Sequence, residues 1–110
     1  MIDLKGRWVL ITGASRGIGR LVAQLMADQG CNTILQSRSV GHTQPLEKSF
    51  IGIGLKSYSI TADLNDLDSV KRMLEEIDGL GVDVDVVLNN AGLQIAYRED
   101  YFKTPVEDYL

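Results

Sequence analysis

The chain has 110 residues, of which 45% are hydrophobic and 24% charged, as in an average globular domain and unlike disordered, collagen-like or coiled-coil chains. Its net charge is −4, whereas a nucleic-acid binder is expected to be basic. The single cysteine excludes a disulfide framework within the chain, and the single histidine counts against a histidine-based metal centre or a protease-type triad. Because no apolar run approaches the roughly 20 residues of a membrane span and no secretory signal opens the chain, we expect one cytoplasmic domain with no membrane partner.

The first half of the chain alternates between strand-like and helix-like segments. Residues 8–12 (WVLIT) are bulky and β-branched, which predicts a short strand buried on both faces. Apolar residues then recur at helical spacing, which predicts a helix that ends at Gly30. Cys31 is interpreted as a small buried residue, and residues 33–36 predict a second strand. The expected buried stripe of the helix consists of Ile18, Leu21, Val22, Leu25 and Met26.

The segment between the second and third expected strands has a weaker pattern. Residues 39–54 contain Pro45 and three glycines, and they predict only a short helix over residues 46–51. Residues 57–62 then alternate in a way that predicts the third strand. The chain thus returns to the strand–helix alternation after this segment.

A second amphipathic helix and a fourth strand follow. Either Asn65 or Asp66 is expected to cap this helix, and Gly79 is expected to end it. Residues 84–88 form a further apolar run, which predicts a buried strand. The order of elements predicts a doubly wound α/β architecture, with a parallel sheet and helices on both faces. The expected stripe of the second helix consists of Leu67, Val70, Met73, Leu74 and Ile77.

The C-terminal residues predict the start of one more helix. Thr104 is typical of an N-cap, Pro105 of the first helical position and Glu107 of the third. The three residues that follow are far fewer than the roughly three turns of an average helix require. We therefore expect the chain to be part of a longer protein.

A glycine-rich loop joins the first strand to the first helix, which is the context of a dinucleotide-binding fingerprint. Gly13 would permit the tight turn, Gly17 would let the backbone approach a pyrophosphate, and Gly19 would let the helix pack closely on the sheet. The helix N-terminus would then offer N–H groups to the anion. In the alternative interpretation, the glycines only shape a plain turn. A Walker-type phosphate loop is excluded because no Gly-Lys-Ser/Thr follows.

Three motifs together resemble the short-chain dehydrogenase/reductase family. They are TGASRGIG at residues 12–19, Ala-Asp-Leu at residues 62–64 and Asn-Asn-Ala-Gly at residues 89–92. The glycine spacing is similar to that of the single-domain branch of the family. The resemblance implies a Rossmann fold with strand order 3-2-1-4, of which residues 1–110 would be the N-terminal part. The strand at residues 84–88 would then be interior in the whole protein and an edge strand in residues 1–110 alone.

The resemblance also implies which residues bind the cofactor. Asp63 would bind the adenine amino group, with Leu64 beside the ring; the alternative is that Asp63 is only an acid near the positive end of the next helix dipole. Asn89, Ala91 and Gly92 would pass beneath the nicotinamide ribose, although a plain turn is the alternative for this motif. The glycine loop would hold the adenosine phosphate and the pyrophosphate through Gly13, Ser15, Arg16, Gly17, Ile18 and Gly19.

Two arginines favour NADP over NAD as the cofactor. Arg38 ends the second expected strand, where an NAD-binding protein has an acidic residue for the ribose. No acid occurs between Asp28 and Glu47. Guanidinium groups from Arg16 and Arg38 suit a 2′-phosphate, which arginine can bind in bidentate fashion. The alternative is that both are solvated surface residues.

The catalytic residues of the family are absent from the chain. The family uses a serine, a tyrosine with a lysine four residues later, and an asparagine; Tyr97 and Tyr101 do not match this pattern. The 110-residue chain is therefore predicted to be inactive. The resemblance implies that the whole protein is an NADP-dependent oxidoreductase of small carbonyl or secondary alcohol substrates, and that it forms a homo-oligomer.

Two other functions remain open from the sequence. A methyltransferase can have a similar sheet, but it usually needs an acid at the end of the second strand, and Arg38 argues against that. A non-catalytic nucleotide-binding or regulatory module would keep the sheet without the chemistry. The presence or absence of the serine, tyrosine and lysine beyond Leu110 would distinguish this module from the enzyme.

Overall fold

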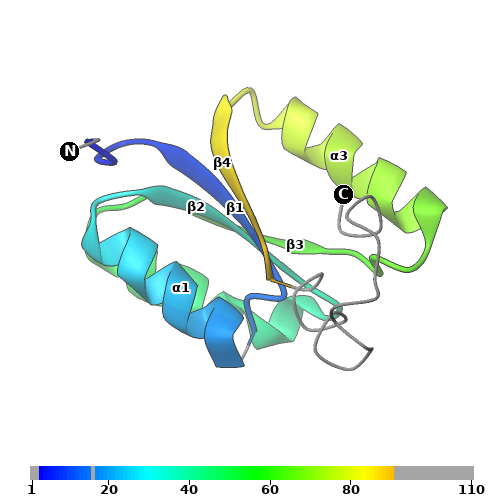
Figure 1. The fold of residues 1–110 in the computed structure, drawn as a ribbon, viewed down its shortest axis with the longest axis horizontal. Helices are drawn as coiled ribbons and strands as arrows, with labels where there is room; N and C mark the ends of the chain where they lie inside the picture. The colour runs from blue at the N-terminus through cyan, green and yellow to red at the C-terminus, as the bar shows by residue number, and fades with distance from the viewer. Residues whose placement is uncertain (1–2, 16, 91–110) are drawn as a thin grey trace, which may run out of the picture.

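A parallel sheet forms the centre of the protein in a computed structural model, which describes residues 3–15 and 17–90. Within this part of the chain the strands lie in the order β3-β2-β1-β4, which confirms the predicted order (Figure 1). All three neighbouring pairs are parallel. Each strand lies within about one residue of its predicted range: β1 Trp8–Thr12, β2 Asn32–Ser37, β3 Ser57–Thr61 and β4 Val84–Asn89.

Helices cover both faces of this sheet, as expected for a doubly wound fold (Figure 1). Helices α1 (Gly17–Asp28) and α2 (Gln44–Gly52) pack on one face, and α3 (Leu67–Gly79) packs on the other. Helix α2 extends beyond the predicted residues 46–51 because Pro45 fits its first turn, where a backbone N–H is not needed. A single 3-10 turn, η1 (Val40–His42), precedes it.

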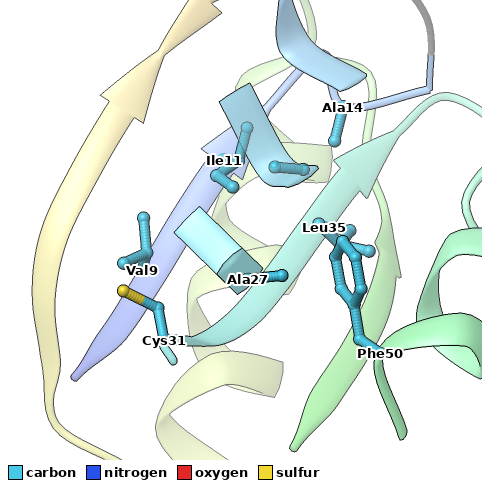
Figure 2. Close-up of a cluster of buried hydrophobic side chains, with 8 residues drawn as sticks. Val9, Ile11, Ala14, Ala27, Cys31, Leu35 and Phe50 are labelled. Atoms are coloured by element: carbon cyan, nitrogen blue, oxygen red, sulfur yellow. The ribbon is translucent and has the colours of Figure 1, made fainter. Parts of the chain in front are cut away.

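Two hydrophobic clusters fill the space between the sheet and the helices. Because side chains alternate along a strand, Val9 and Ile11 enter the cluster under α1 and α2, whereas Leu10 enters the one under α3. Figure 2 shows the first cluster, with Phe50 of α2 beside Leu35 of β2. Strands β1 and β2 are thus buried on both faces; for β1 this was predicted from its apolar run, whereas residues 33–36 predicted only a strand.

Cys31 is fully buried at the edge of the first cluster (Figure 2). Its thiol donates a hydrogen bond of 3.4 Å to the carbonyl oxygen of Leu4. Burial raises the pKa of this thiol, because an apolar environment disfavours the charged thiolate. The residue therefore packs as a small apolar group, as interpreted from the sequence.

The predicted buried stripe of α1 is wrong for its large residues. Ile18, Leu21 and Leu25 are at least half exposed, at 58%, 59% and 50%. The helix instead buries Gly19, Ala23 and Ala27, with Val22 and Met26 half-buried. The reason is steric: small residues let the helix axis approach the sheet, so the large side chains of the same turns face away.

The stripe of α3 is only partly correct as well. Met73 and Ile77 are buried, while Leu67 and Leu74 are exposed. The helix begins after Asp66, whose carboxylate accepts a 3.0 Å hydrogen bond from the backbone N–H of Asp68. Asp66, and not Asn65, is therefore the N-cap. Gly79 is the last helical residue, as predicted.

Strand β4 is less buried than its apolar run alone predicts, as expected for an edge strand in residues 1–110. Among the described strands only β1 pairs with it, so β4 lies at an edge of the sheet. Its side chains alternate between half-buried and exposed, and Val87 is 59% exposed. Val86 and Leu88 still pack against the first cluster. The predicted helix start at Thr104 lies outside the described residues.

Candidate functional site

The predicted binding residues gather at the carboxyl ends of the strands. The strands are parallel, and their pairing ends with Thr12 opposite Asn89 and Ser37 opposite Thr61. The segments that leave β1, β2 and β3 therefore emerge at one edge of the sheet. In open α/β sheets this is the edge where ligands bind.

The glycine loop leaves β1 through backbone conformations that favour glycine. Gly13 has a φ of 62° and Gly17 a φ of 61°, both in the left-handed region. Helix α1 begins at Gly17, so its first backbone N–H groups lie at this edge of the sheet. None of the described residues lies within 4 Å of the position that a Cβ atom at Gly17 would take, so these residues leave room for a ligand beside the helix start. Ser15 is half-buried in the loop and Ile18 is exposed.

Gly19 brings α1 against the end of β1. A Cβ atom at this position would collide with the carbonyl oxygen of Gly13, and it would lie 2.7 Å from Nδ2 of Asn90. Close helix packing is the role that the glycine spacing predicts for Gly19. Contact of the loop glycines with a cofactor stays a prediction.

Two carboxamide side chains hold the backbone of Gly13 from opposite sides. From β2, Oε1 of Gln36 accepts a 2.8 Å hydrogen bond from the Gly13 N–H. From the end of β4, Nδ2 of Asn90 donates a 3.2 Å hydrogen bond to the Gly13 carbonyl oxygen. Sequence reasoning did not assign a role to either residue. A polar residue inside the apolar run of β2 was the available signal for Gln36.

Asn89 binds the end of β1 rather than the loop itself. Oγ1 of Thr12 lies 3.1 Å from Oδ1 of Asn89 and donates a hydrogen bond to it. This contact ties the last residues of β1 and β4 together at the site edge. The structure thus places Asn89 beside the glycine loop, while its predicted contact with a ribose stays a prediction.

Arg38 and Asp63 lie together at the ends of β2 and β3. Nη2 of Arg38 is 4.0 Å from Oδ1 of Asp63, and their side chains are 75% and 52% exposed. The sequence has no acid near Arg38, but the fold brings one from the neighbouring strand. Asp63 is oriented locally: its Oδ1 accepts a 3.0 Å hydrogen bond from the Asn65 N–H, and its own N–H donates to Oγ of Ser69.

The remaining predicted residues divide into two groups. Leu64 is half-buried against the cluster under α3, next to Asp63. Arg16, Ala91 and Gly92 lie outside the described residues, as do Tyr97 and Tyr101. In the part of the chain that the structure describes, no three His, Cys, Asp or Glu residues are grouped as metal ligands. None of the described helices is long and apolar enough to span a membrane.

A pocket of about 620 Å³ lies at the opposite edge of the sheet, at the amino ends of the strands. Its walls include Lys5, Lys56 and the stacked rings of Trp8 and Tyr58, whose centroids are 5.8 Å apart. Asp85 closes one side, where it binds the Trp8 N–H at 3.1 Å. No residue predicted to bind the cofactor lines this pocket, so the carboxyl edge remains the candidate site.

Comparisons with known proteins agree with this geometry. Residues 7–108 match the family model for short chain dehydrogenase. Versicolorin reductase 1 of Dothistroma septosporum is 34% identical over 92 residues, covering 82% of this chain and 35% of that protein. A 3-oxoacyl-(acyl-carrier-protein) reductase of Staphylococcus aureus is 36% identical over 85 residues, covering 76% of this chain and 35% of the reductase.

A solved structure extends the comparison to three dimensions. A metagenomic short-chain oxidoreductase in complex with NADP superposes with a TM-score of 0.70 at 27% identity, over 78% of this chain and 39% of that one. The chain thus spans about a third of the length of the curated relatives it matches. With the family model matched over nearly all of its residues and the strand order 3-2-1-4 observed, the chain belongs to the short-chain dehydrogenase family.

Proposed function

We propose that this chain forms the NADP-binding part of an oxidoreductase that reduces carbonyl groups, 3-oxoacyl groups among them, or oxidises secondary alcohols. The observation that carries the proposal is the arrangement at the carboxyl edge of the sheet. There the start of α1, the exposed Arg38 and the exposed Asp63 surround one region of the surface. Each of these three features could bind a different group of a dinucleotide.

The start of α1 fits the pyrophosphate. Its first N–H groups have no partner within the helix, and the helix dipole adds partial positive charge at this end. The open space around Gly17 lets an anion come close to the backbone. Because Gly19 has no Cβ atom, which would collide with the Gly13 carbonyl oxygen, the helix start can pack closely against β1. These features supply binding without any side-chain charge.

Arg38 fits the 2′-phosphate of NADP. Family members use NAD or NADP, so the fold itself does not choose between them. The ion pair of Arg38 with Asp63 is long and exposed, and such pairs contribute little free energy. The guanidinium group can therefore turn to a phosphate at small cost, while Asp63 remains available for the adenine amino group. Arg16, in the glycine loop, is the second proposed phosphate ligand.

The reaction class comes from the relatives. Both curated relatives described above are named reductases, one of versicolorin and one of 3-oxoacyl groups on a carrier protein. A serine, a tyrosine and a lysine of the family pattern would have to come from outside these 110 residues. The chain itself supplies cofactor binding, and we expect no turnover from residues 1–110 alone.

Exchanging Arg38 tests the choice of cofactor. In the protein at its natural length, NADPH should bind more tightly than NADH, and Arg38→Asp should reverse that order. Repulsion would then replace a charge-assisted contact, which is worth about 1.5–3 kcal/mol, or roughly 10- to 150-fold in affinity. Titration calorimetry with both cofactors measures the two dissociation constants.

Lys56→Asp is the matched control, because it makes the same change of charge just before β3, at the opposite edge of the sheet. It should leave the preference unchanged. Equal affinity of the unaltered protein for NADPH and NADH would contradict the proposal. Tight NADPH binding without any turnover of carbonyl or alcohol substrates would instead favour a non-catalytic nucleotide-binding module.

A further inference from the structure

We infer that Gln36 is a positioning residue, which sets the glycine loop and the adenine side of the site in their binding arrangement; the inference rests on the proposed function. Gln36 lies on β2, two residues before Arg38, and only 3% of it is exposed. Because the side chain is buried, we infer that it acts through the backbone groups to which it is hydrogen-bonded. Neither the sequence motifs nor the family match assigns it a role.

Both ends of the Gln36 carboxamide are used. Oε1 accepts from the Gly13 N–H at 2.8 Å, and Nε2 donates to the Ala62 carbonyl oxygen at 2.8 Å. The partners fix the orientation of the amide, because only a donor suits Ala62 and only an acceptor suits Gly13. One side chain therefore connects the exit of β1 to the exit of β3 across β2.

These two backbone groups lie where regular strand pairing ends. The ladder between β1 and β2 ends with Ile11 opposite Leu35, so Gly13 is beyond it. The next residue, Ala14, donates a 2.9 Å hydrogen bond to the backbone carbonyl oxygen of Gln36. Gln36 thus binds two successive N–H groups of the loop, one through its side chain and one through its backbone.

The connection joins the two halves of the proposed cofactor site. Gly13 opens the loop that is proposed to hold the pyrophosphate. Ala62 immediately precedes Asp63, the proposed adenine ligand. If the carboxamide is lost, the Gly13 N–H and the Ala62 carbonyl lose buried partners, which is costly for backbone groups. The loop would then relax toward arrangements that no longer match the cofactor.

Gln36→Met tests this role, because it keeps the length of the side chain and removes both hydrogen bonds. Thr33→Val is the matched control: Thr33 is fully buried on the same strand, and its hydroxyl bonds Oγ of Ser57 on β3 at 2.8 Å. In the protein at its natural length, Gln36→Met should weaken NADPH binding roughly tenfold or more and speed hydrogen exchange of the Gly13 amide. Thr33→Val should lower the melting temperature without either effect.

Several results would overturn the inference. If Gln36→Met lowers the melting temperature as Thr33→Val does but binds NADPH as tightly as the unaltered protein, the residue is merely structural. Absence of NADPH binding by the unaltered protein would overturn the proposed function first, and the positioning role with it. If Gln36→Met does not fold, the inference is tested by nuclear magnetic resonance on the unaltered protein. Saturation with NADPH should then shift the signal of the Gln36 side-chain amide together with that of the Gly13 backbone amide. A shift of Gly13 alone would contradict the inference.

Discussion

Gly17 and Gly19 lie two residues apart in the first turn of α1, yet each is a glycine for a different physical reason. Gly17 has a left-handed backbone and open space around it. Gly19 lacks room, since any Cβ would meet the carbonyl of Gly13. At the residue scale, Gly17 thus serves the chain conformation and is proposed to give a ligand access to the helix start, whereas Gly19 serves helix packing. Substitutions should separate the two.

Gly19→Ala should destabilise the fold and weaken NADPH binding. The new methyl group meets backbone, so α1 must move away from β1, and overpacking of this kind costs about 1–3 kcal/mol. Gly52→Ala is the control, because it is a helical glycine with nothing within 4 Å, and it should be neutral or stabilise by up to about 1 kcal/mol. Urea unfolding measures both. Equal effects of the two substitutions would contradict the packing role of Gly19.

Gly17→Val should remove NADPH binding, because its side chain would occupy the space of the pyrophosphate. The positive φ at this position adds backbone strain of about 1–2 kcal/mol, so some loss of stability is expected as well. Gly6→Val separates the two effects, since Gly6 has a φ of 80° and equally open surroundings at the other end of β1. Both variants should melt earlier, but only Gly17→Val should lose the cofactor. Normal NADPH affinity in Gly17→Val would show that the loop is a plain turn.

At the element scale, the strands were predictable and the buried faces of the helices were only partly so. β1 and β2 are short apolar runs between turn residues, and such runs have few alternatives to a buried strand. The spacing of apolar residues in α1 predicts a helix, but it does not predict which face of the helix packs against the sheet. That side was decided by Gly19, Ala23 and Ala27, whose small size permits close approach.

The sequence predicts that either Asn65 or Asp66 is the N-cap of α3, and the structure shows that it is Asp66. Asp66→Ala should lower the free energy of unfolding by about 0.5–2 kcal/mol, because it removes the acceptor for the Asp68 N–H. Asn65→Ala should have a much smaller effect, since its side chain is exposed and is not the cap. Thermal melts of both variants measure the difference. A larger loss for Asn65→Ala would contradict the assigned cap.

The candidate site was predictable where a residue acts through the backbone or ends a strand. Gly13, Gly17 and Gly19 carry a recognisable spacing; Arg38 directly follows β2, and Asp63 lies two residues after β3. The pairing of Arg38 with Asp63 was missed, because residues 25 positions apart meet only once strand order is known. Gln36 was missed for the same reason: its partners, Gly13 and Ala62, directly follow two other strands.

At the scale of the whole molecule, apolar surface remains exposed on several elements. Leu21 and Leu25 face outward from α1, Leu67 and Leu74 from α3, and Val87 from the edge strand β4. An edge strand with apolar side chains is a template for pairing with another chain. The exposed residues therefore predict how the 110-residue polypeptide behaves when it is produced by itself.

Residues 1–110 alone should self-associate or aggregate, with β4 as a principal contact. Val87→Lys should reduce the association, because a charged side chain on an edge strand opposes pairing. Ile53→Lys is the control, since Ile53 is 65% exposed but follows α2, away from β4. Sedimentation velocity measures the size distribution of each variant. A monodisperse monomer that melts cooperatively would refute this prediction.

The central claim, that a dinucleotide binds at the carboxyl edge of the sheet, is tested most directly by mapping NADPH onto the backbone amides of the protein at its natural length. Titration followed by nuclear magnetic resonance should give saturable shifts at Gly13, Arg38 and Asp63. Gly6 and Lys56, at the amino ends of the same strands, should not shift. Shifts confined to the amino ends, or no saturable shift at all, would contradict the account.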